Sequence, residues 1–401
     1  MFTHAMKRIG TWYRVFNLAA GLVQRGHSVR IAKVGMTRLV PEEKIEDGVS
    51  ILELPRMWGS SLFHEATRMP VDIAARFALQ LSHRYDIVHA FTHHLNALLP
   101  ALLGSWMGRG ATVLGDRDDL WSEGGLLGAP EGRGLVGSAD YRFHHWTEYN
   151  MARWLGTMTV VSDDLMRRVL ETGVSPLRVR KLINGCPVDR IKPGDCAAAR
   201  HQLGLPADRE ICLFVGVGIY DVDLVLDALA QLRKIRPQKQ LPLTVIVGPP
   251  PDATRALADA RGVAGDVLTP GFLKDAELPP YFHSADVGLL PFADKPLNWA
   301  RFPIKLGDYL AAGLPVLTND IGEMGRIVGE ENAGEVTASN PEAYARGMAR
   351  LLDDQIRLEG CRRRARAAAE RMSWSAVSGQ LEEYYLALRA GSRDRQLSTI
   401  S

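Results

Sequence analysis

The stretch Asn298-Trp-Ala-Arg-Phe-Pro-Ile-Lys-Leu-Gly-Asp-Tyr-Leu-Ala-Ala-Gly-Leu-Pro-Val-Leu-Thr-Asn319 contains the signals of a loop, a helix, a stop and a strand. Pro303 suits the first helical position, where its missing N–H costs nothing. The apolar residues that follow it fall on one face at helical spacing. Gly313 is a natural C-terminal stop and Pro315 forbids continuation, so a short buried strand follows the helix at once.

Charged residues gather at the start of this predicted helix. Its first N–H groups have no partner within the helix, and together with the helix dipole they form a site for anions. Arg301 and Lys305 flank these groups, and Asp308 follows Lys305 at i+3, on the same side and one turn deeper. A carboxylate there can accept both hydroxyls of a ribose while the helix start holds phosphates. Taken alone, such a pair is more often a solvated surface ion pair, so its surroundings must favour the functional interpretation.

Composition sets broad limits on the protein. The chain has 401 residues, enough for two domains, with 46% hydrophobic and 23% charged residues and a net charge of +2. This near-neutral charge gives no support for a nucleic-acid partner. The four cysteines show neither metal spacing nor a dense disulfide pattern, so we expect a reducing cytoplasm. No apolar run reaches transmembrane length and no secretory signal is evident, although basic and aromatic patches leave peripheral association with a membrane open.

Strands and helices alternate along the first half of the chain. Strands are expected at 28–34, 48–54, 86–91, 111–114, 157–161 and 178–183, with helices at 15–25, 71–83, 95–107 and 141–154. Such alternation indicates a parallel sheet covered on both faces, with ligands beyond the carboxyl ends of its strands. The first strand is nearly absent. We expect either that this sequence begins downstream of the natural start, or that residues 2–4 are the end of that strand.

Three loops leave strand ends in this half: Gly10-Thr11, His93-His94 and Asp116-Arg-Asp-Asp-Leu-Trp121. A Gly-Thr pair is often only a turn, and histidines after a strand are often satisfied by backbone groups. The third loop is harder to dismiss, because three carboxylates packed so tightly repel one another. They require a cation, a hydroxyl-rich ligand or water, which slightly favours a functional role.

A second α/β unit follows a proline-containing linker at 187–195. Strands are expected at 211–216, 243–248, 267–269, 287–291, 315–318 and 333–336, with helices at 222–233, 278–284 and 341–352 and a helical tail at 355–390. We therefore predict an N-terminal acceptor-binding domain at 1–190 and a C-terminal nucleotide-sugar-binding domain at 191–375. A C-terminal helix at 376–401 is expected to return to the first domain. Facing strand ends would leave a cleft that suits a reaction between two ligands.

Several short motifs occur in a fixed order. They are Gly26-His27, Asp86-Ile-Val-His89, Val161-Ser162, Asn184-Gly185, Phe214-Val-Gly216, Ala285-Asp286 and Tyr309-Leu-Ala-Ala-Gly313. In this order, and over nearly the whole chain, they resemble the retaining glycosyltransferases of family 4, which have the GT-B fold. The resemblance implies an α/β protein of two Rossmann-like domains whose parallel sheets face each other across a cleft. It also implies a nucleotide-sugar donor in the C-terminal domain and a sugar acceptor mainly in the N-terminal one.

The resemblance assigns roles to individual residues. The donor set is Asp308 for the ribose, Lys305 and Arg301 for the diphosphate, the backbone of Phe272 and Leu273 for the base, and Gly216, Gly10 and Thr11 in glycine-containing loops. The catalytic set is Lys305, Arg301 and Asp118, and the acceptor set is His93, Asp119 and Trp121. No metal and no cofactor is expected, because lysine, arginine and the helix start would neutralise the diphosphate.

The chain also departs from the family pattern. Ala300 stands where the family has the first Glu of a paired motif, Val217 and Tyr220 replace an Arg and a Lys, and Asp118 replaces a His. We interpret these departures as those of a subfamily. Two alternatives stay open: a nucleotide-sugar 2-epimerase, which needs no acceptor, and a catalytically weak sugar-nucleotide-binding subunit. A Rossmann dehydrogenase is disfavoured, because no Gly-x-Gly-x-x-Gly follows a strand.

Overall fold

The chain divides into two compact units. The computed structural model describes residues 1–5, 10–35, 40–54, 70–107, 110–129, 131, 134–216 and 221–398. Unit 1 comprises Met1–Asn184, Ala300–Phe302 and Trp374–Ser401, and unit 2 comprises Gly185–Trp299 and Pro303–Ser373. The observed divisions therefore fall near residues 184 and 373. The boundaries predicted from the sequence were 190 and 375. The short segment Ala300–Phe302 groups with unit 1, which the sequence did not indicate.

Unit 1 is built on an eight-stranded sheet in the order β3-β4-β2-β1-β5-β6-β7-β8. Its strands are β1 (Phe2–Thr3), β2 (Arg30–Val34), β3 (Glu42–Glu46), β4 (Val49–Leu54), β5 (Ile87–Phe91), β6 (Thr112–Arg117), β7 (Met158–Val160) and β8 (Val179–Lys181). Neighbouring strands are parallel, as predicted, except for the β3–β4 pair. The sequence missed β3 because this edge strand has no buried residue, so its composition is mostly charged.

The two-residue strand β1 lies in the middle of this sheet. Phe2 pairs with Ala32 of β2 on one side and with Ala90 of β5 on the other. The expectation that residues near Phe2 form a short strand end is thus matched by the structure. The connection from β1 leads to one side of the sheet and the later strands fill the other side. The carboxyl ends of β1 and β5 therefore meet at a topological switch point, where α/β sheets usually bind ligands.

Helices flank the sheet of unit 1. They are α1 (Thr11–Gln24), α2 (Pro70–Ser82), α3 (Leu95–Trp106), α4 (Gly134–Leu155), α5 (Asp163–Glu171) and α15 (Trp374–Ser398), with a 3-10 turn at Pro176–Arg178. Helix α4 begins at Gly134, seven residues before the start expected at 141. Ser162 caps α5, because its side chain accepts a hydrogen bond from the Leu165 N–H at 3.2 Å. Among the described helices, none is long and apolar enough to cross a membrane.

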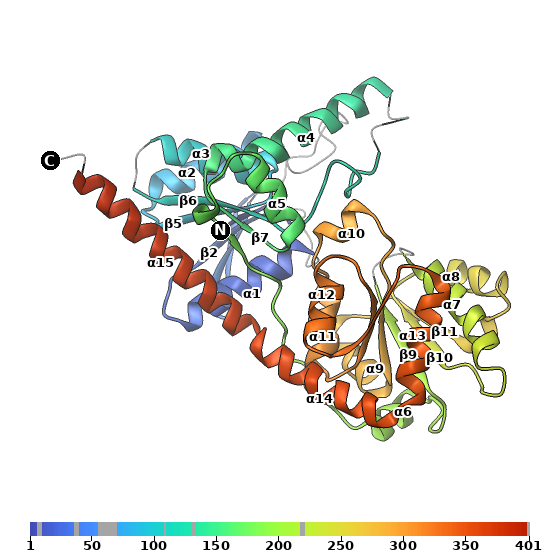
Figure 1. Cartoon of the computed structure of the whole chain (residues 1–401). Coiled ribbons are helices and arrows are strands. Elements are labelled where there is room, and N and C mark those ends of the chain that lie inside the picture. Colours follow the sequence, from blue (N-terminus) through green and yellow to red (C-terminus); the bar gives the residue numbers. More distant parts are fainter. Residues whose placement is uncertain are drawn as a thin grey trace. The chain divides into compact units, whose positions relative to one another are not determined.

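The last helix, α15, packs along α1 within unit 1 (Figure 1, red beside blue). Val377 and Leu381 are buried in one hydrophobic cluster with Leu18 of α1. The two helices approach closely, since a Cβ added at Gly21 would lie 2.1 Å from the Ser378 hydroxyl oxygen. The C-terminal helix therefore completes the core of the first unit.

Unit 2 contains a fully parallel six-stranded sheet in the order β11-β10-β9-β12-β13-β14. Its strands are β9 (Ile211–Val215), β10 (Leu243–Val247), β11 (Val267–Gly271), β12 (Val287–Leu290), β13 (Val316–Asn319) and β14 (Gly334–Thr337). Its helices are α6 (Cys196–Leu203), α7 (Val222–Ile235), α8 (Pro251–Asp259), α9 (Pro279–Ser284), α10 (Pro296–Ala300), α11 (Ile304–Ala311), α12 (Gly322–Glu330), α13 (Pro341–Asp353) and α14 (Gln355–Arg371), with 3-10 turns at Ala264–Asp266 and Asp275–Glu277. The fold thus matches the predicted class of two parallel-sheet α/β domains.

Between residues 298 and 319, two details of the prediction were wrong. The segment before α11 is not only a loop, because it contains the short helix α10. Helix α11 begins at Ile304, and Pro303 occupies the N-cap with an extended ψ of 133° instead of the first helical position. Helix α12 was also missed, because three glycines in nine residues lower its helix propensity.

Truncation of Leu381 should destabilise unit 1. Leu381 is fully buried against α1, so Leu381→Ala removes apolar contacts and leaves a cavity that costs about 2–5 kcal/mol. Leu386→Ala on the same helix is the matched control, because this side chain is 58% exposed and its loss should change stability by less than about 0.5 kcal/mol. Urea unfolding followed by circular dichroism measures both variants, and equal losses would contradict the assignment of α15 to the core.

Candidate functional site

The structure brings the three predicted loops of unit 1 together. β1, β5 and β6 are neighbours in the sheet, and Gly10-Thr11, His93-His94 and residues 118–121 follow their carboxyl ends. Strand β6 extends to Arg117, however, so Asp116 and Arg117 belong to the strand and not to the loop. The three carboxylates still act on one another as the sequence suggested, because, in addition to burial, Asp116 raises the pKa of Asp118 and Asp118 raises the pKa of Asp119.

The cation for Asp116 comes from helix α1. The Arg14 guanidinium donates from Nε to Asp116 Oδ1 at 2.9 Å and from Nη2 to Oδ2 at 2.8 Å. The two side chains are 1% and 0% exposed, and the Thr159 hydroxyl also donates to this carboxylate. The sequence did not indicate a role for Arg14. It lies four residues before the buried Leu18, but a charged residue on a helix usually faces solvent, so this spacing did not predict its burial.

Asp118 and Asp119 follow Asp116 along the chain and are half-buried. Burial, together with the charge of Asp116, raises the pKa of Asp118 to about 6, although the Thr11 side chain hydrogen-bonds to it. Burial and the neighbouring Asp118 raise the pKa of Asp119 further from its ordinary value, against the opposing charge of Arg301. A carboxyl group with a pKa near 6 can take up or release a proton close to neutral pH.

Arg301 is held beside Asp119 by two backbone anchors. The Ser162 hydroxyl donates to the Ala300 carbonyl at 2.6 Å, and the Asn184 side-chain amide donates to the Phe302 carbonyl at 2.8 Å. These bonds fix the residues on both sides of Arg301 within unit 1. The structure therefore joins three predicted residues, Arg301, Asp118 and Asp119, in one electrostatic group.

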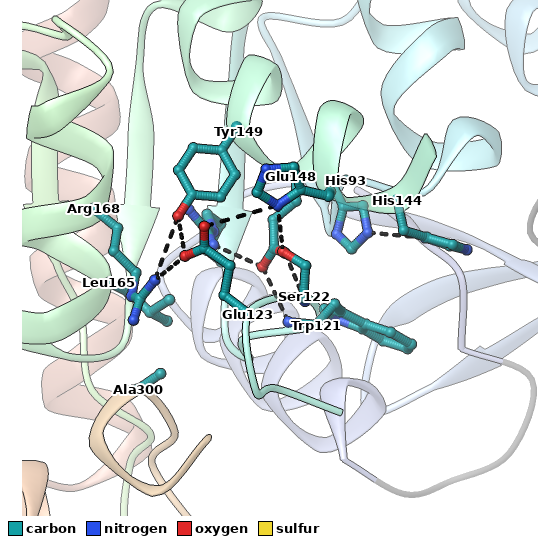
Figure 2. A network of polar contacts seen from close by, with 12 residues as sticks. His93, Trp121, Ser122, Glu123, His144, Glu148, Tyr149, Leu165, Arg168 and Ala300 are labelled. Carbon is teal, nitrogen blue, oxygen red and sulfur yellow. Dashed lines mark hydrogen bonds and ion pairs between the residues drawn. The ribbon is translucent and has the colours of Figure 1, made fainter. Parts of the chain in front are cut away.

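Glu148 of α4 shapes the loop that carries Trp121 (Figure 2). Its carboxylate accepts hydrogen bonds from Arg117 at 2.7 Å, from the Trp121 and Ser122 N–H groups at 3.1 and 2.9 Å, and from the Ser122 hydroxyl at 2.6 Å. Burial alone would raise the pKa of Glu148, but Arg117 and these hydrogen bonds lower it to about 2. The sequence missed this residue, because one glutamate in an aromatic helix gives no sign of such partners.

The predicted acceptor residues His93 and Trp121 lie close together. Their ring centroids are 5.7 Å apart, and the His94 ring is 4.4 Å from that of Trp121. His93 Nε2 lies 3.2 Å from His144 Nδ1 of α4. Burial lowers the pKa of His93 to about 3, so its ring is neutral at pH 7. The preceding Thr92 has a φ of 103°, a conformation rare for a β-branched residue, which is seen more often near functional sites.

In unit 2, Lys305 and Asp308 form the pair that the sequence predicted. Lys305 Nζ donates to Asp308 Oδ2 at 2.8 Å, and the side chains are 24% and 9% exposed. The pair is therefore mostly buried in the first turns of α11 and is not a solvated surface pair. Helix α11 is attached to the sheet through Tyr309, whose hydroxyl oxygen accepts a hydrogen bond from the Val215 N–H at the end of β9 at 2.9 Å.

Glycines line the carboxyl ends of three neighbouring strands of unit 2. The Gly216 N–H donates to the Val247 carbonyl at 3.0 Å, and the Gly248 N–H donates to the Gly271 carbonyl at 2.8 Å. Gly248 has a φ of 108°, and a Cβ there would lie 1.6 Å from the Gly216 carbonyl oxygen. The sequence predicted Gly216 but missed the other two. At these carboxyl ends the three glycines carry no side chains, so a ligand can approach the backbone closely.

The remaining donor candidates lie at the ends of the elements that were expected to carry them. Phe272, 72% exposed, and Leu273 directly follow β11. Gly10 precedes α1 with a φ of 52°, a conformation that favours glycine. No interaction in the described residues connects Phe272 or Leu273 with Lys305. Val217 and Tyr220 lie outside the described residues.

Comparisons with known proteins agree with this architecture. Residues 10–185 match the family model described as a glycosyl transferase 4-like domain, and residues 196–371 match the model of glycosyl transferases group 1. The chain belongs to glycosyltransferase family 4, with the GT-B fold. Its structure is similar to sucrose-phosphate synthase from Thermosynechococcus elongatus, with a TM-score of 0.72, 20% identity and coverage of 96% of this chain and 94% of the other.

The chain is also similar to a solved structure with a bound nucleotide sugar and to a curated relative. The structure of Anabaena HepE in complex with UDP-glucose is similar with a TM-score of 0.70 and 15% identity, over 96% of this chain and 98% of the other. The D-inositol 3-phosphate glycosyltransferase 2 of Catenulispora acidiphila is 30% identical over 224 residues, which are 53% of this chain and 51% of the relative. The chain thus spans about half the length of the curated relatives it matches.

Replacement of Asp118 by Asn should stabilise the protein at neutral pH. The folded-state pKa of about 6 exceeds the ordinary 3.8, so the folded state binds more protons between about pH 4 and 6 and loses stability as pH rises through this window. Asn carries no charge, so Asp118→Asn should gain on the order of 2 kcal/mol at pH 7 and nothing below about pH 4. Urea unfolding at both pH values measures this difference.

The matched control for this change is Asp47→Asn, an exposed position in a turn of the same unit. It should leave the free energy of unfolding nearly unchanged at both pH values. A gain for Asp118→Asn that is equal at pH 4 and pH 7 would contradict the raised pKa.

Proposed function

We propose that this chain is a retaining glycosyltransferase that moves a sugar from a nucleotide-diphosphate sugar to an acceptor hydroxyl. The observation that carries the proposal is the Lys305–Asp308 pair at 2.8 Å, mostly buried at the start of α11. The pair lies in the region that matches the group 1 glycosyl transferase model. The names of the curated relatives and the UDP-glucose complex of the similar Anabaena structure support the same chemistry.

Unit 2 is proposed to bind the donor. The first N–H groups of α11 and the Lys305 ammonium receive the diphosphate, and Asp308 accepts hydrogen bonds from the ribose hydroxyls. The ion pair holds both side chains in place before the ligand arrives, which lowers the cost of ordering them. Positive charge fixed in this way stabilises the diphosphate as it leaves, and this is the main demand of the reaction. In this proposal the diphosphate needs no metal ion.

Unit 1 is proposed to bind the acceptor. Asp118 orients the attacking hydroxyl or the donor sugar, His93 and Trp121 contact the acceptor, and Arg301 adds positive charge. Retention follows if the acceptor attacks on the face from which the diphosphate leaves and a phosphate oxygen takes the proton. The curated relatives act, by their names, on D-inositol 3-phosphate. A polyol phosphate is therefore the first acceptor class to test.

A turnover assay tests this proposal against the open alternatives. UDP- and GDP-sugars that raise the melting temperature are first selected, since a ligand at 100 times its Kd stabilises by about 2.7 kcal/mol. Nucleotide release that requires an acceptor, with a new glycoside of the donor's anomeric configuration, is the expected result. An isomerised sugar nucleotide formed without acceptor would instead indicate an epimerase. Binding without turnover for every acceptor class would indicate a non-catalytic subunit.

Two substitutions in α11 should separate charge stabilisation from ribose binding. Lys305→Ala removes an electrostatic group aimed at the leaving diphosphate, so kcat should fall roughly 100-fold or more. Asp308→Asn weakens hydrogen bonds to a charged acceptor, so the donor KM should rise roughly 10- to 100-fold. Initial rates over a range of donor concentrations measure both parameters.

Exposed residues of the same unit provide the controls. Lys234→Ala on α7 and Asp208→Asn in the loop before β9 remove the same charges from solvated positions, and both variants should keep the wild-type kcat and KM. Wild-type rates in Lys305→Ala would remove Lys305 from the mechanism and the proposal would lose its central observation.

A further inference from the structure

Three buried histidines from two elements of unit 1 converge beside β5. His93 and His94 follow the end of β5, and His144 comes from the middle of α4. One side-chain nitrogen from each lies within 4.8 Å of the other two, and each residue is 2% exposed. His93 and His144 are separated by 51 positions in the sequence, so the fold and not a local motif creates the cluster.

The spacing of these nitrogens suits a tetrahedral metal ion. Bonds of 2.0–2.1 Å from imidazole nitrogens to zinc place two such ligands about 3.3 Å apart. His93 Nε2 and His144 Nδ1 are already 3.2 Å apart, and Figure 2 shows the two rings directed toward each other. One nitrogen of His94 belongs to a set of three, one from each histidine, that all lie within 4.8 Å of one another, so small side-chain rotations bring three nitrogens to one ion.

The surroundings also resemble the outer shell of a metal site. When Nδ1 of His144 faces the ion, its Nε2 faces the Asp140 carboxylate, which lies 3.9 Å away. A carboxylate behind a histidine ligand fixes the ring and increases its basicity. Arg117, whose charge acts on His93, is paired with Glu148 at 2.7 Å, so its charge is largely balanced. A bound divalent cation would therefore lie near the Asp140 carboxylate and near the Arg117–Glu148 ion pair, whose net charge is close to zero.

We propose that His93, His94 and His144 bind one divalent transition-metal ion of the zinc class, through three imidazole nitrogens. Neutral imidazole suits zinc, nickel, copper and cobalt better than magnesium or calcium, which prefer oxygen ligands. The ion would join the end of β5 to α4, with a water molecule as its fourth ligand. The site lies in unit 1, apart from the residues proposed to bind the diphosphate, and it shares His93 with the proposed acceptor site.

Titration with the metal alone tests this proposal on the full-length chain. After removal of metal with a chelator, isothermal titration with Zn²⁺ should show one ion bound per chain. Titration with Co²⁺ should produce the visible absorption of a four-coordinate ion. X-ray absorption of the zinc-bound protein should give three imidazole nitrogens at about 2.0 Å. This last measurement needs no variant, so it decides the ligand set even if substitutions disturb folding.

Single substitutions test whether these histidines, and not the neighbouring His145, bind the metal ion. His144→Asn and His94→Asn should lose the Co²⁺ absorption and weaken Zn²⁺ binding at least 10-fold. His145→Asn is the matched control. The His145 side chain is next to His144 in the sequence but is 40% exposed, so its replacement should leave metal binding unchanged. Circular dichroism of the metal-free variants confirms folding. Absence of a bound ion in the wild type, or equal binding by His144→Asn and His145→Asn, would overturn the proposal.

Discussion

The buried ion pair between Arg14 and Asp116 is the interaction on which the rest of unit 1 depends. Two charges removed from water are tolerated only when their hydrogen-bonding groups are satisfied. Here the Arg14 guanidinium donates hydrogen bonds to three different residues. Beyond its two bonds to Asp116, the guanidinium donates to the Ile183 carbonyl and to the Asn184 side-chain oxygen at 3.2 and 3.1 Å. Asn184 in turn holds the Phe302 carbonyl. A continuous set of hydrogen bonds therefore links α1, β6 and the segment that carries Arg301.

This arrangement explains why protons are retained near the carboxyl end of β6. Arg14 balances the charge of Asp116 through hydrogen bonds to it, and its charge only partly offsets the rise in the pKa of Asp118. The carboxyl groups of Asp118 and Asp119 are half-buried next to each other, and Arg301 is the opposing charge that acts on Asp119. Two neighbouring carboxylates that are partly removed from water cannot both ionise easily, so their pKa values rise. The position of Arg301, set by the anchors on either side of it, thus influences the protonation of the whole group.

The sequence predicted those features that depend on local patterns. Apolar runs marked the buried strands, and the i+3 spacing placed Lys305 beside Asp308, as the distance of 2.8 Å confirms. It could not predict Arg14 or Glu148, because a charged residue on a helix usually faces solvent, and only the neighbouring strand or loop shows that it is buried. The approach of His144 to His93 depends on how α4 packs across 51 residues of intervening chain. Such contacts arise from tertiary packing and have no period in the sequence.

The departures from the family pattern are related to one another in the structure. Ala300 replaces a glutamate and is fully buried, with its carbonyl bonded to Ser162, whereas Asp118 replaces a histidine nearby in the chain's first unit. A glutamate at position 300 would add a carboxylate next to Arg301, whose charge already acts on Asp119. Three carboxylates around one guanidinium would repel one another and raise their pKa values further. In this chain the carboxylates of the group come instead from Asp118 and Asp119, which follow β6, and the charge of Arg301 acts on Asp119. The uncharged side chain at position 300 therefore leaves the charge of Arg301 to Asp119 and adds no further repulsion to the group.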